Sequence, residues 1–335
     1  MTRIAHRPFR APGRAVRRAL TVVLAAGMAA TLAACSSGAS ASADATSSST
    51  HSVATARGMV SVPAHPLRVV SVHSWTTESL FDLGVKPVGV ENTGEEYVPP
   101  RYLTRWKAAP KIATGATIDF EKIASLKPDL IVGVNVPYLE KDYAKLSAIA
   151  PTVFAPFNSK TTWQTYPTYT AKFVNKQAQL TSLETKYNDE IAAVRDDYAD
   201  ELSSIKWDIV QGGFDAGNYW IYSTTSDVGR IITKLGGTFA TATRDVKAGQ
   251  TNSVSYEQAD LLSSADDIIY YTNNDGSPAN NIDKLFALPA FKKLAGAQKG
   301  HLIGTSDFLP GSYSDAIGLV GSIRDALNAE AAAKG

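Results

Sequence analysis

The longest regular pattern of hydrophobic and polar positions covers residues 169–205. Apolar side chains recur there at steps of three or four, without proline or glycine, and mostly charged or amide side chains fill the other positions. The apolar positions are Leu180, Leu183, Tyr187, Ile191, Val194, Tyr198, Leu202 and Ile205. This pattern predicts one amphipathic helix with a single apolar stripe, about 55 Å long. Such a helix forms either a coiled coil or a connection between two lobes, and the flanking sequence distinguishes these alternatives.

Short apolar runs alternate with short helical patterns on both sides of this stretch. The runs typical of strands are residues 68–72, 85–90, a run beginning at Ile112, 129–134, 207–211, 218–222, 268–271 and 301–304. Helical patterns cover residues 76–84, 226–235 and about 312–332. Strands that alternate with helices indicate α/β lobes, and in the first lobe the sheet should be mostly parallel.

One helix–strand segment occurs twice. Residues 120–132 and 256–270 both begin with an aromatic residue followed by a glutamate, Glu121 or Glu257, and both end in a strand that follows an acid. Each glutamate also lies two residues after a candidate helix cap, Asp119 or Ser255. The two copies flank the long helix, which therefore reads as a connection between two lobes.

The N-terminus has the layout of a secretory signal. Six arginines precede an apolar segment at residues 19–30, which is too short to span a bilayer and is followed by small residues. Arg17 and Arg18 leave a twin-arginine export route open. The segment ends Leu-Ala-Ala before Cys35, which resembles a bacterial lipobox and implies lipidation of that cysteine; an ordinary cleavage site beside a chance cysteine is the alternative.

The sequence thus predicts five segments. Residues 36–57 are mostly Ser, Ala and Thr, which favours a flexible tether because little apolar surface is available to offset the ordering entropy. The predicted segments are the signal peptide (1–34), lipidated Cys35 with its tether (35–57), an N-terminal lobe (58–162), the interlobe helix (163–206) and a C-terminal lobe with a final helix (207–335).

Composition and motifs exclude several classes of function. After residue 34 the chain carries 27 basic and 32 acidic residues, a poor balance for nucleic-acid binding. Lipidation of Cys35, the single cysteine, leaves no thiol for a disulfide, a metal or catalysis. Beyond the tether, His65, His73 and His301 are dispersed, so we expect no metal site built by the protein. The chain has no G-x-S-x-G, P-loop or H-E-x-x-H motif, and we expect no enzyme.

Several motifs, in their order and spacing, carry a resemblance to a known family. They are residues 68–71, 77–84, 86–90, 121–131, 235–237, 255–257 and 308–312. Over about residues 60–330 the chain resembles the class III substrate-binding proteins of ABC importers, which take up iron–siderophore complexes, haem and vitamin B12. The resemblance implies two Rossmann-like α/β lobes, one long rigid interlobe helix and a ligand cleft between the lobes.

The family also implies partners and a location. It implies that Glu121 and Glu257 dock into arginine pockets on the membrane permease, which works with an ATPase. The rigid helix would hold these glutamates at a nearly fixed separation. The alternative is that each glutamate only offsets the positive end of its helix dipole. The protein would be an exported monomer, lipid-anchored on the outer face of the cytoplasmic membrane, with no directly bound cofactor because iron arrives as a siderophore chelate.

A bulky, partly apolar chelate calls for aromatic walls and a few fixed donors. Loops and strand ends supply the candidates, although each aromatic side chain alone fits the core or the rim equally well. They are Trp75, Tyr97, Tyr138, Trp220, Tyr222, Arg244, Tyr271 and Phe308. Because these loops hold few basic residues, a near-neutral hydroxamate chelate is favoured over an anionic catecholate. Vitamin B12 or haem, or a surface lipoprotein with an enzymatic or adhesive role, are the alternatives.

Overall fold

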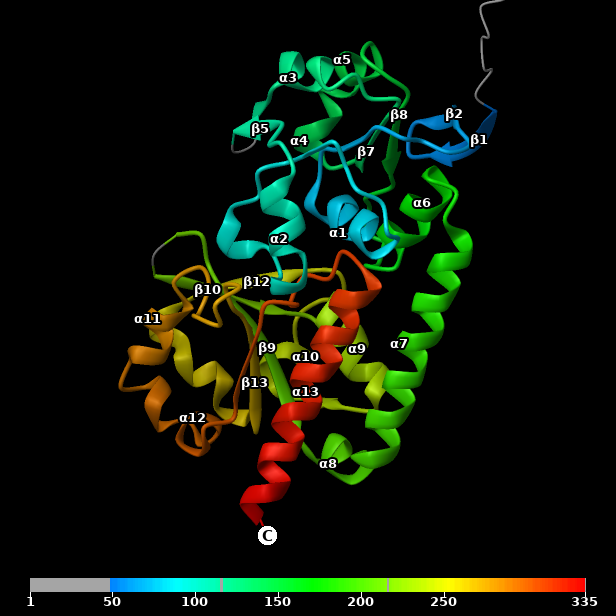
Figure 1. The fold of residues 1–335 in the computed structure, drawn as a ribbon. Helices are drawn as coiled ribbons and strands as arrows, with labels where there is room; N and C mark the ends of the chain where they lie inside the picture. The colour runs from blue at the N-terminus through cyan, green and yellow to red at the C-terminus, as the bar shows by residue number, and fades with distance from the viewer. Residues whose placement is uncertain (1–48, 115–116, 216, 335) are drawn as a thin grey trace, which may run out of the picture. The chain divides into compact units, whose positions relative to one another are not determined.

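The computed structural model describes residues 49–114, 117–215 and 217–334, which belong to one unit, residues 47–335 (Figure 1). The predicted signal peptide, the lipidated Cys35 and most of the predicted tether therefore lie outside the described residues. None of the described helices is both long and apolar enough to cross a membrane.

The predicted tether extends too far into the fold. Strand β1 (Thr50–Thr55) pairs antiparallel with β2 (Gly58–Pro63), so residues 50–57 belong to a hairpin. Val53 and Val62 bury their side chains, and the Ala56 amide donates to the Phe154 carbonyl at 2.8 Å. The alternating valines, with partners supplied by a later segment, therefore order a stretch whose composition alone favours disorder.

The first sheet is parallel and almost wholly buried. Its strand order is β4-β3-β7-β8, formed by β3 (Val69–Ser71), β4 (Gly89–Val90), β7 (Leu130–Val134) and β8 (Thr152–Ala155). Burial of all residues in these strands is typical of parallel sheets covered on both faces. The connecting helices are α1 (Ser74–Asp82), η1 (Glu95–Tyr97), α2 (Pro100–Ala108), α3 (Phe120–Ser125), α4 (Pro137–Glu140) and α5 (Tyr143–Ser147). The run predicted from Ile112 forms only β5 (Ala113–Thr114), which pairs with β6 (Thr117–Ile118) outside this sheet.

The second sheet is mixed. Its path is β12-β10-β9-β13-β14, and the short β11 pairs with β9. The strands are β9 (Lys206–Gly212), β10 (Asn218–Tyr222), β11 (Thr238–Phe239), β12 (Thr251–Ser255), β13 (Asp267–Tyr271) and β14 (Leu302–Thr305). β10 is antiparallel to both of its neighbours, β9 and β12, whereas β9, β11, β13 and β14 run parallel to one another. Around them lie α9 (Asp227–Leu235), α10 (Thr241–Arg244), η2 (Tyr256–Ser264), α11 (Ile282–Ala287), η3 (Phe291–Lys293) and α12 (Ala295–Lys299).

The prediction of one uninterrupted helix over residues 169–205 is wrong. The segment forms α6 (Thr165–Phe173), α7 (Gln177–Asp197) and α8 (Ala199–Ser204). Asn175 adopts a left-handed conformation with φ of 55°, and the Lys176 amide returns to the Ala171 carbonyl at 2.8 Å, an arrangement that ends α6. The second break lies at Tyr198, whose φ is −131°. The longest piece, α7, has 21 residues and is therefore only about 32 Å long.

Helix α7 does not connect the lobes alone. It packs against the C-terminal helix α13 (Tyr313–Lys334), as Figure 1 shows. Buried side chains of both helices, including Tyr187, Ile191, Leu319 and Ile323, belong to one hydrophobic core that also contains the strands of the first sheet. The predicted class, an α/β protein with two lobes, is confirmed, and the connection is a packed helix pair.

Candidate functional site

The first lobe contributes residues from the start of α1. His73 follows β3 and caps α1, because its Nδ1 accepts a hydrogen bond from the Trp75 amide at 3.2 Å. Burial lowers the pKa of His73 to about 3, so the ring is neutral near pH 7 and can accept this bond. The cap fixes the first turn of α1 at the carboxyl end of β3, the edge of a parallel sheet where ligands bind. Trp75 lies in this turn, and Glu78 lies in the next turn of the helix.

The second lobe contributes the carboxyl ends of its parallel strands. Tyr271 ends β13, and the loop after β14 carries Phe308. Phe308 is fully buried and packs edge-on against Tyr222, with ring centroids 5.3 Å apart, and tilted against Tyr271 at 5.8 Å. This aromatic group faces the start of α1 from the other lobe.

An aromatic cavity of about 550 Å³ lies between these two sets of residues. We define it by its aromatic and apolar lining: Trp75, Phe157, Tyr166, Tyr222, Val228, Phe308 and Leu309. Trp75 stacks on Tyr166 with ring centroids 4.4 Å apart and on Phe157 at 6.2 Å. The rings of the two lobes thus form opposite walls, as a bulky ligand with an apolar surface requires.

The polar lining of the aromatic cavity consists mostly of hydroxyl and amide groups. They come from Asn158, Ser159, Thr161, Ser223, Thr225, Ser226, Gln250 and Thr251. Asp227 and Arg230 are the charged residues among the described residues that line it. Burial raises the pKa of Asp227 to about 6, although the Trp163 amide donates to its carboxylate at 3.0 Å. The Arg230 side chain is exposed and donates through Nε to the Thr225 carbonyl at 2.9 Å.

A second cavity of about 270 Å³ shares Trp75 and Leu309 with the first. We call it the acidic cavity because three carboxyl groups line it, those of Glu78, Asp307 and Asp315. Tyr97 from the first lobe and Tyr271 from the second also line it, with ring centroids 6.1 Å apart. The acidic cavity therefore also lies between the lobes.

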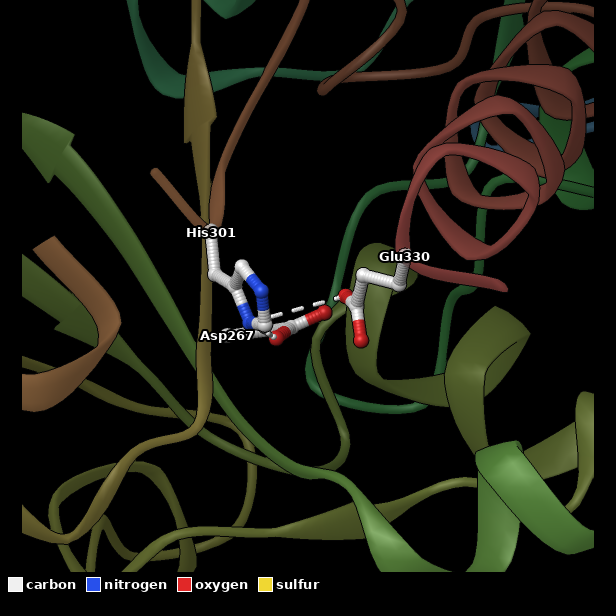
Figure 2. A group of neighbouring side chains, drawn as sticks. All are labelled: Asp267, His301 and Glu330. Carbon is white, nitrogen blue, oxygen red and sulfur yellow. Dashed lines mark hydrogen bonds and ion pairs between the residues drawn. The ribbon is translucent and has the colours of Figure 1, made fainter. Parts of the chain in front are cut away.

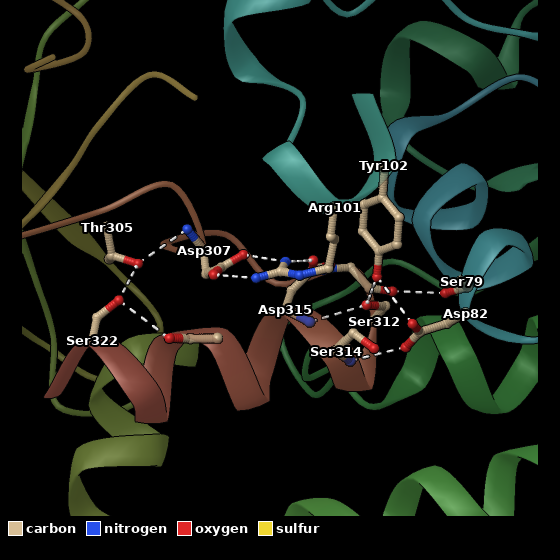
Figure 3. A network of polar contacts seen from close by, with 12 residues as sticks. Ser79, Asp82, Arg101, Tyr102, Thr305, Asp307, Ser312, Ser314, Asp315 and Ser322 are labelled. Atoms are coloured by element: carbon tan, nitrogen blue, oxygen red, sulfur yellow. Dashed lines mark hydrogen bonds and ion pairs between the residues drawn. The ribbon is translucent and has the colours of Figure 1, made fainter. Parts of the chain in front are cut away.

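One arginine bridges two of these acids across the lobes (Figure 3). Arg101 of α2 donates to both carboxylate oxygens of Asp307 and to Asp315 Oδ1 at 2.6 Å. Burial opposes the charge of the guanidinium, but the hydrogen bonds and charge of Asp307 raise the pKa of Arg101. Burial and the charge of Asp307 raise the pKa of Asp315 to about 7. Burial raises the pKa of Glu78 well above its usual range, and the Asp315 and Glu91 carboxylates add to this effect.

Further hydrogen bonds tie the lobes together around this arginine. Ser79 Oγ donates to the Gly311 carbonyl at 2.6 Å, and the Tyr102 hydroxyl bonds Ser312 Oγ at 2.7 Å. A Cβ at Gly311 would lie 2.1 Å from Glu78 Oε2 and 2.6 Å from the Trp75 Cα, so only glycine fits this close approach. The side of the cleft that contains the acidic cavity is thus a fixed junction.

The structure distributes the eight predicted ligand residues over several places. The aromatic cavity is lined by Trp75, Tyr222 and Phe308. The acidic cavity is lined by Trp75, Tyr97 and Tyr271. Tyr138 lines a third cavity, together with His73 and Glu91. Trp220 and Arg244 line none of these three cavities. Trp220 packs edge-on against the exposed Phe214, and Arg244 is exposed and pairs with Asp245.

Most of the residues that line the aromatic cavity were not predicted from the sequence; among them are Phe157, Tyr166, Arg230 and Leu309. Phe157 follows β8, so the rule that ligand loops follow strands would have found it if residues 152–155 had been recognised as a strand. Arg230 lies in the first turns of α9, whose Ser226 cap and Gly236 end agree with the sequence pattern. The sequence pattern does not show which helices begin at the cleft between the lobes.

The repeated segments adopt similar local structures. Asp119 accepts from the Lys122 amide at the start of α3, and Ser255 accepts from the Glu257 amide at the start of η2. Glu121 and Glu257 are exposed in the first turns. Their side chains are therefore accessible to a partner, whereas Glu78 is buried in the acidic cavity.

Comparison with protein families matches residues 69–307 to the family described as periplasmic binding protein. Among curated proteins of Bacillus subtilis (strain 168), the chain is 34% identical over 177 residues to the probable siderophore-binding lipoprotein YfiY. That match covers 52% of this chain and 53% of YfiY, so it spans about half the length of the relative. The chain is also 25% identical over 257 residues to the iron(3+)-hydroxamate-binding protein YxeB, covering 75% of this chain and 76% of YxeB.

A solved structure shares the fold. It is a siderophore periplasmic binding protein from the fuscachelin gene cluster of Thermobifida fusca, with a TM-score of 0.70 and 23% sequence identity. The match covers 80% of this chain and 98% of that structure. The fold of this chain is therefore a known architecture.

Proposed function

The chain belongs to the periplasmic binding protein family, and we propose that it captures a ferric siderophore outside the cell for an ABC importer. The curated relatives are named as binding proteins rather than enzymes, in agreement with the sequence analysis. The siderophore and hydroxamate in the names of YfiY and YxeB support this ligand class for the present chain.

The observation that carries the proposal is the aromatic cavity. Its volume of about 550 Å³ suits a compact chelate, and aromatic rings from both lobes can cover the apolar surface of that chelate. With Asp227 and Arg230 as its charged lining, the cavity has no excess of positive charge to attract an anionic catecholate. This balance favours a near-neutral ferric hydroxamate.

The donor set also favours iron that arrives already chelated. Among the described residues that line the aromatic cavity there is no His or Cys, and the one carboxylate, Asp227, already accepts the Trp163 amide. In a siderophore complex the chelator fills the coordination shell, so the protein needs to recognise only the outer surface of the complex. Arg230 and the hydroxyl groups are suitable donors for its carbonyl oxygens.

We further propose that Glu121 and Glu257 dock the loaded protein onto the permease, one glutamate from each lobe. Their exposure and their equivalent positions after the Asp119 and Ser255 caps support this role. The protein would act as a monomer, held at the outer face of the cytoplasmic membrane through lipidated Cys35, and would pass its ligand to a permease driven by an ATPase.

Ligand binding can be tested by tryptophan-fluorescence quenching. We expect saturable quenching by a ferric trihydroxamate, because Trp75 lines the aromatic cavity, and weaker or no quenching by a ferric catecholate, haem or vitamin B12. A Trp75→Phe variant should lose most of the quenching signal, whereas Trp220→Phe serves as a control outside the cavity. If none of the ferric chelates gives saturable quenching, the proposal is wrong.

Docking can be tested separately in cells. Glu121→Ala combined with Glu257→Ala should abolish siderophore uptake while leaving ligand affinity unchanged, because both side chains lie outside the cavities. Glu140→Ala combined with Asp260→Ala removes two other exposed acids, one from each lobe, as a matched control. Normal transport by the first double variant would show that the docking assignment is wrong.

A further inference from the structure

Three residues that are far apart in the sequence meet beside the second sheet. Asp267 begins β13, His301 directly precedes β14, and Glu330 lies in the last turns of α13. The parallel register pairs Ile268 with Leu302, and the Ile268 amide donates to the His301 carbonyl at 3.0 Å, so Asp267 and His301 are neighbours across the two strands. Helix α13 packs along β14 and brings Glu330 to the same point.

The side chains of these residues converge (Figure 2). His301 Nδ1 lies 3.0 Å from Asp267 Oδ1 and 3.6 Å from Glu330 Oε1. One ligand atom from each of the three residues lies within 4.8 Å of the other two. The Asp267 side chain is fully buried, and its Oδ2 has no hydrogen-bond partner among the described residues. A buried carboxylate oxygen without a partner is costly, so this geometry calls for either a cation between the side chains or a proton shared by the Asp267 and Glu330 carboxyl groups.

We propose that Asp267, His301 and Glu330 bind a divalent transition-metal ion such as Zn²⁺ or Mn²⁺. Zinc lies about 2.0–2.2 Å from imidazole nitrogen and carboxylate oxygen, which places neighbouring ligand atoms of a tetrahedral site about 3.3–3.6 Å apart. The distance from His301 Nδ1 to Glu330 Oε1 is in this range, and the distance to Asp267 Oδ1, 3.0 Å, is slightly shorter and would lengthen around an ion. A mixed imidazole and carboxylate set suits Zn²⁺ or Mn²⁺ better than Mg²⁺ or Ca²⁺, which prefer oxygen ligands.

Electrostatics is consistent with a cation at this position. Two carboxyl groups and a neutral imidazole give a ligand set of charge −2, which a divalent ion neutralises. Without an ion, burial and then the Glu330 carboxylate raise the pKa of Asp267 to about 8. A proton shared between the two acids is therefore the competing occupant, and the experiment must distinguish it from a metal.

The proposed metal site is separate from the two cavities between the lobes. Asp267 and Tyr271 are the first and last residues of β13, so about 13 Å of strand separates this site from the acidic cavity. A hollow of about 360 Å³, lined in part by His301, Glu330 and Lys299, borders the site. The His301 side chain is 22% exposed, which leaves a route by which an ion could enter.

A metal here would fasten the C-terminal end of α13 to the second sheet. The opposite end of the same helix carries Asp315, which pairs with Arg101 at the junction of the lobes. The ion would therefore fix the far end of a helix whose first turns hold the lobes together. This assigns it a structural role, in contrast to the iron, which is cargo.

Calorimetric titration of the EDTA-treated full chain with Zn²⁺, and separately with Mn²⁺, tests the site. We expect one ion of at least one of these metals to bind per chain, and its affinity to fall at least tenfold in Glu330→Gln and in Asp267→Asn. Asp325→Asn, which removes an exposed acid from the same helix, should bind like the unchanged protein. The bound ion should also raise the midpoint of thermal unfolding in the unchanged protein and in Asp325→Asn, but not in Glu330→Gln.

Two results would overturn the proposal. If neither metal binds, the two acids share a proton instead. If the affinity is the same in Glu330→Gln as in the unchanged protein, the ion binds elsewhere. Glu330 lies near the end of α13, so its substitution is the least disruptive; together with His301→Gln it decides the question if Asp267→Asn fails to fold.

Discussion

The two cavities between the lobes share Trp75 and Leu309 but differ in how their polar groups are used. In the acidic cavity, Asp307 and Asp315 are bridged by Arg101, and the surrounding hydrogen bonds join one lobe to the other. In the aromatic cavity, the hydroxyl and amide groups line a space of about twice the volume between aromatic walls. Together with the proposed function, this difference leads us to propose a division of roles, in which the acidic cavity would stabilise the junction and the aromatic cavity would bind the ligand.

The largest expected effect comes from Arg101→Gln. The change leaves Asp307 and Asp315 buried without their cation, and breaking a buried pair in this way typically costs about 3–5 kcal/mol. The partly exposed Arg101 side chain places the expected loss near the lower value, about 3 kcal/mol in urea unfolding at pH 8. Lys107→Gln removes an exposed ion pair from the same helix and should cost less than about 1 kcal/mol.

The pH dependence of this loss has a definite sign. The folded-state pKa of Asp315 is about 7, above its ordinary value of 3.8, because of burial and then the charge of Asp307. Between these values the folded state binds the proton more tightly, so this carboxyl disfavours the folded state increasingly as pH rises through that range. Without Arg101 the penalty on the ionised acids grows. Arg101→Gln should therefore destabilise the protein more at pH 8 than at pH 5, and an equal loss at both would contradict the assigned role.

A smaller effect, on affinity instead of stability, is expected from Arg230→Gln. If Arg230 donates to an oxygen of the bound chelate, its loss should weaken binding about tenfold or more, since charge-assisted hydrogen bonds contribute about 1.5–3 kcal/mol. Arg244→Gln is the matched control, because Arg244 is exposed and lines neither of the two cavities between the lobes. Fluorescence titration with a ferric trihydroxamate measures both variants. If only Arg244→Gln lost affinity, the chelate would bind outside the aromatic cavity.

The contrast between these arginines shows what the sequence could and could not predict. Local patterns predicted a helix over residues 226–235, which is α9 with its Ser226 cap, because the signals that start and end a helix lie close together in the chain. Placing Trp75 and Phe308 in the cleft required only the rule that ligand loops follow parallel strands. Choosing Arg230 over Arg244 required knowledge of which helix starts face the other lobe, which depends on contacts between distant segments.

The prediction of one long helix over residues 169–205 was wrong for a related reason. Its apolar spacing is real, since Leu180, Tyr187, Ile191, Val194 and Leu202 are all buried. Periodicity, however, reports which face is buried and does not report whether the backbone is continuous. Asn175, which tolerates a left-handed conformation, was the one local sign of a break, and a single asparagine does not normally end a helix pattern.

Tyr97 gives the smallest predicted effect and the closest test of the division between the cavities. It was predicted as a ligand contact, but it lines the acidic cavity, where its hydroxyl donates to Asn280 Oδ1 of the other lobe at 3.1 Å. If it mainly ties the lobes, Tyr97→Phe should lower the free energy of unfolding by about 1 kcal/mol, the typical contribution of one hydrogen bond. Its affinity for the chelate should change less than threefold. Tyr138→Phe, at a side chain that is 48% exposed, should change neither quantity. A tenfold loss of affinity in Tyr97→Phe without loss of stability would instead show that the chelate extends past Trp75 into the acidic cavity.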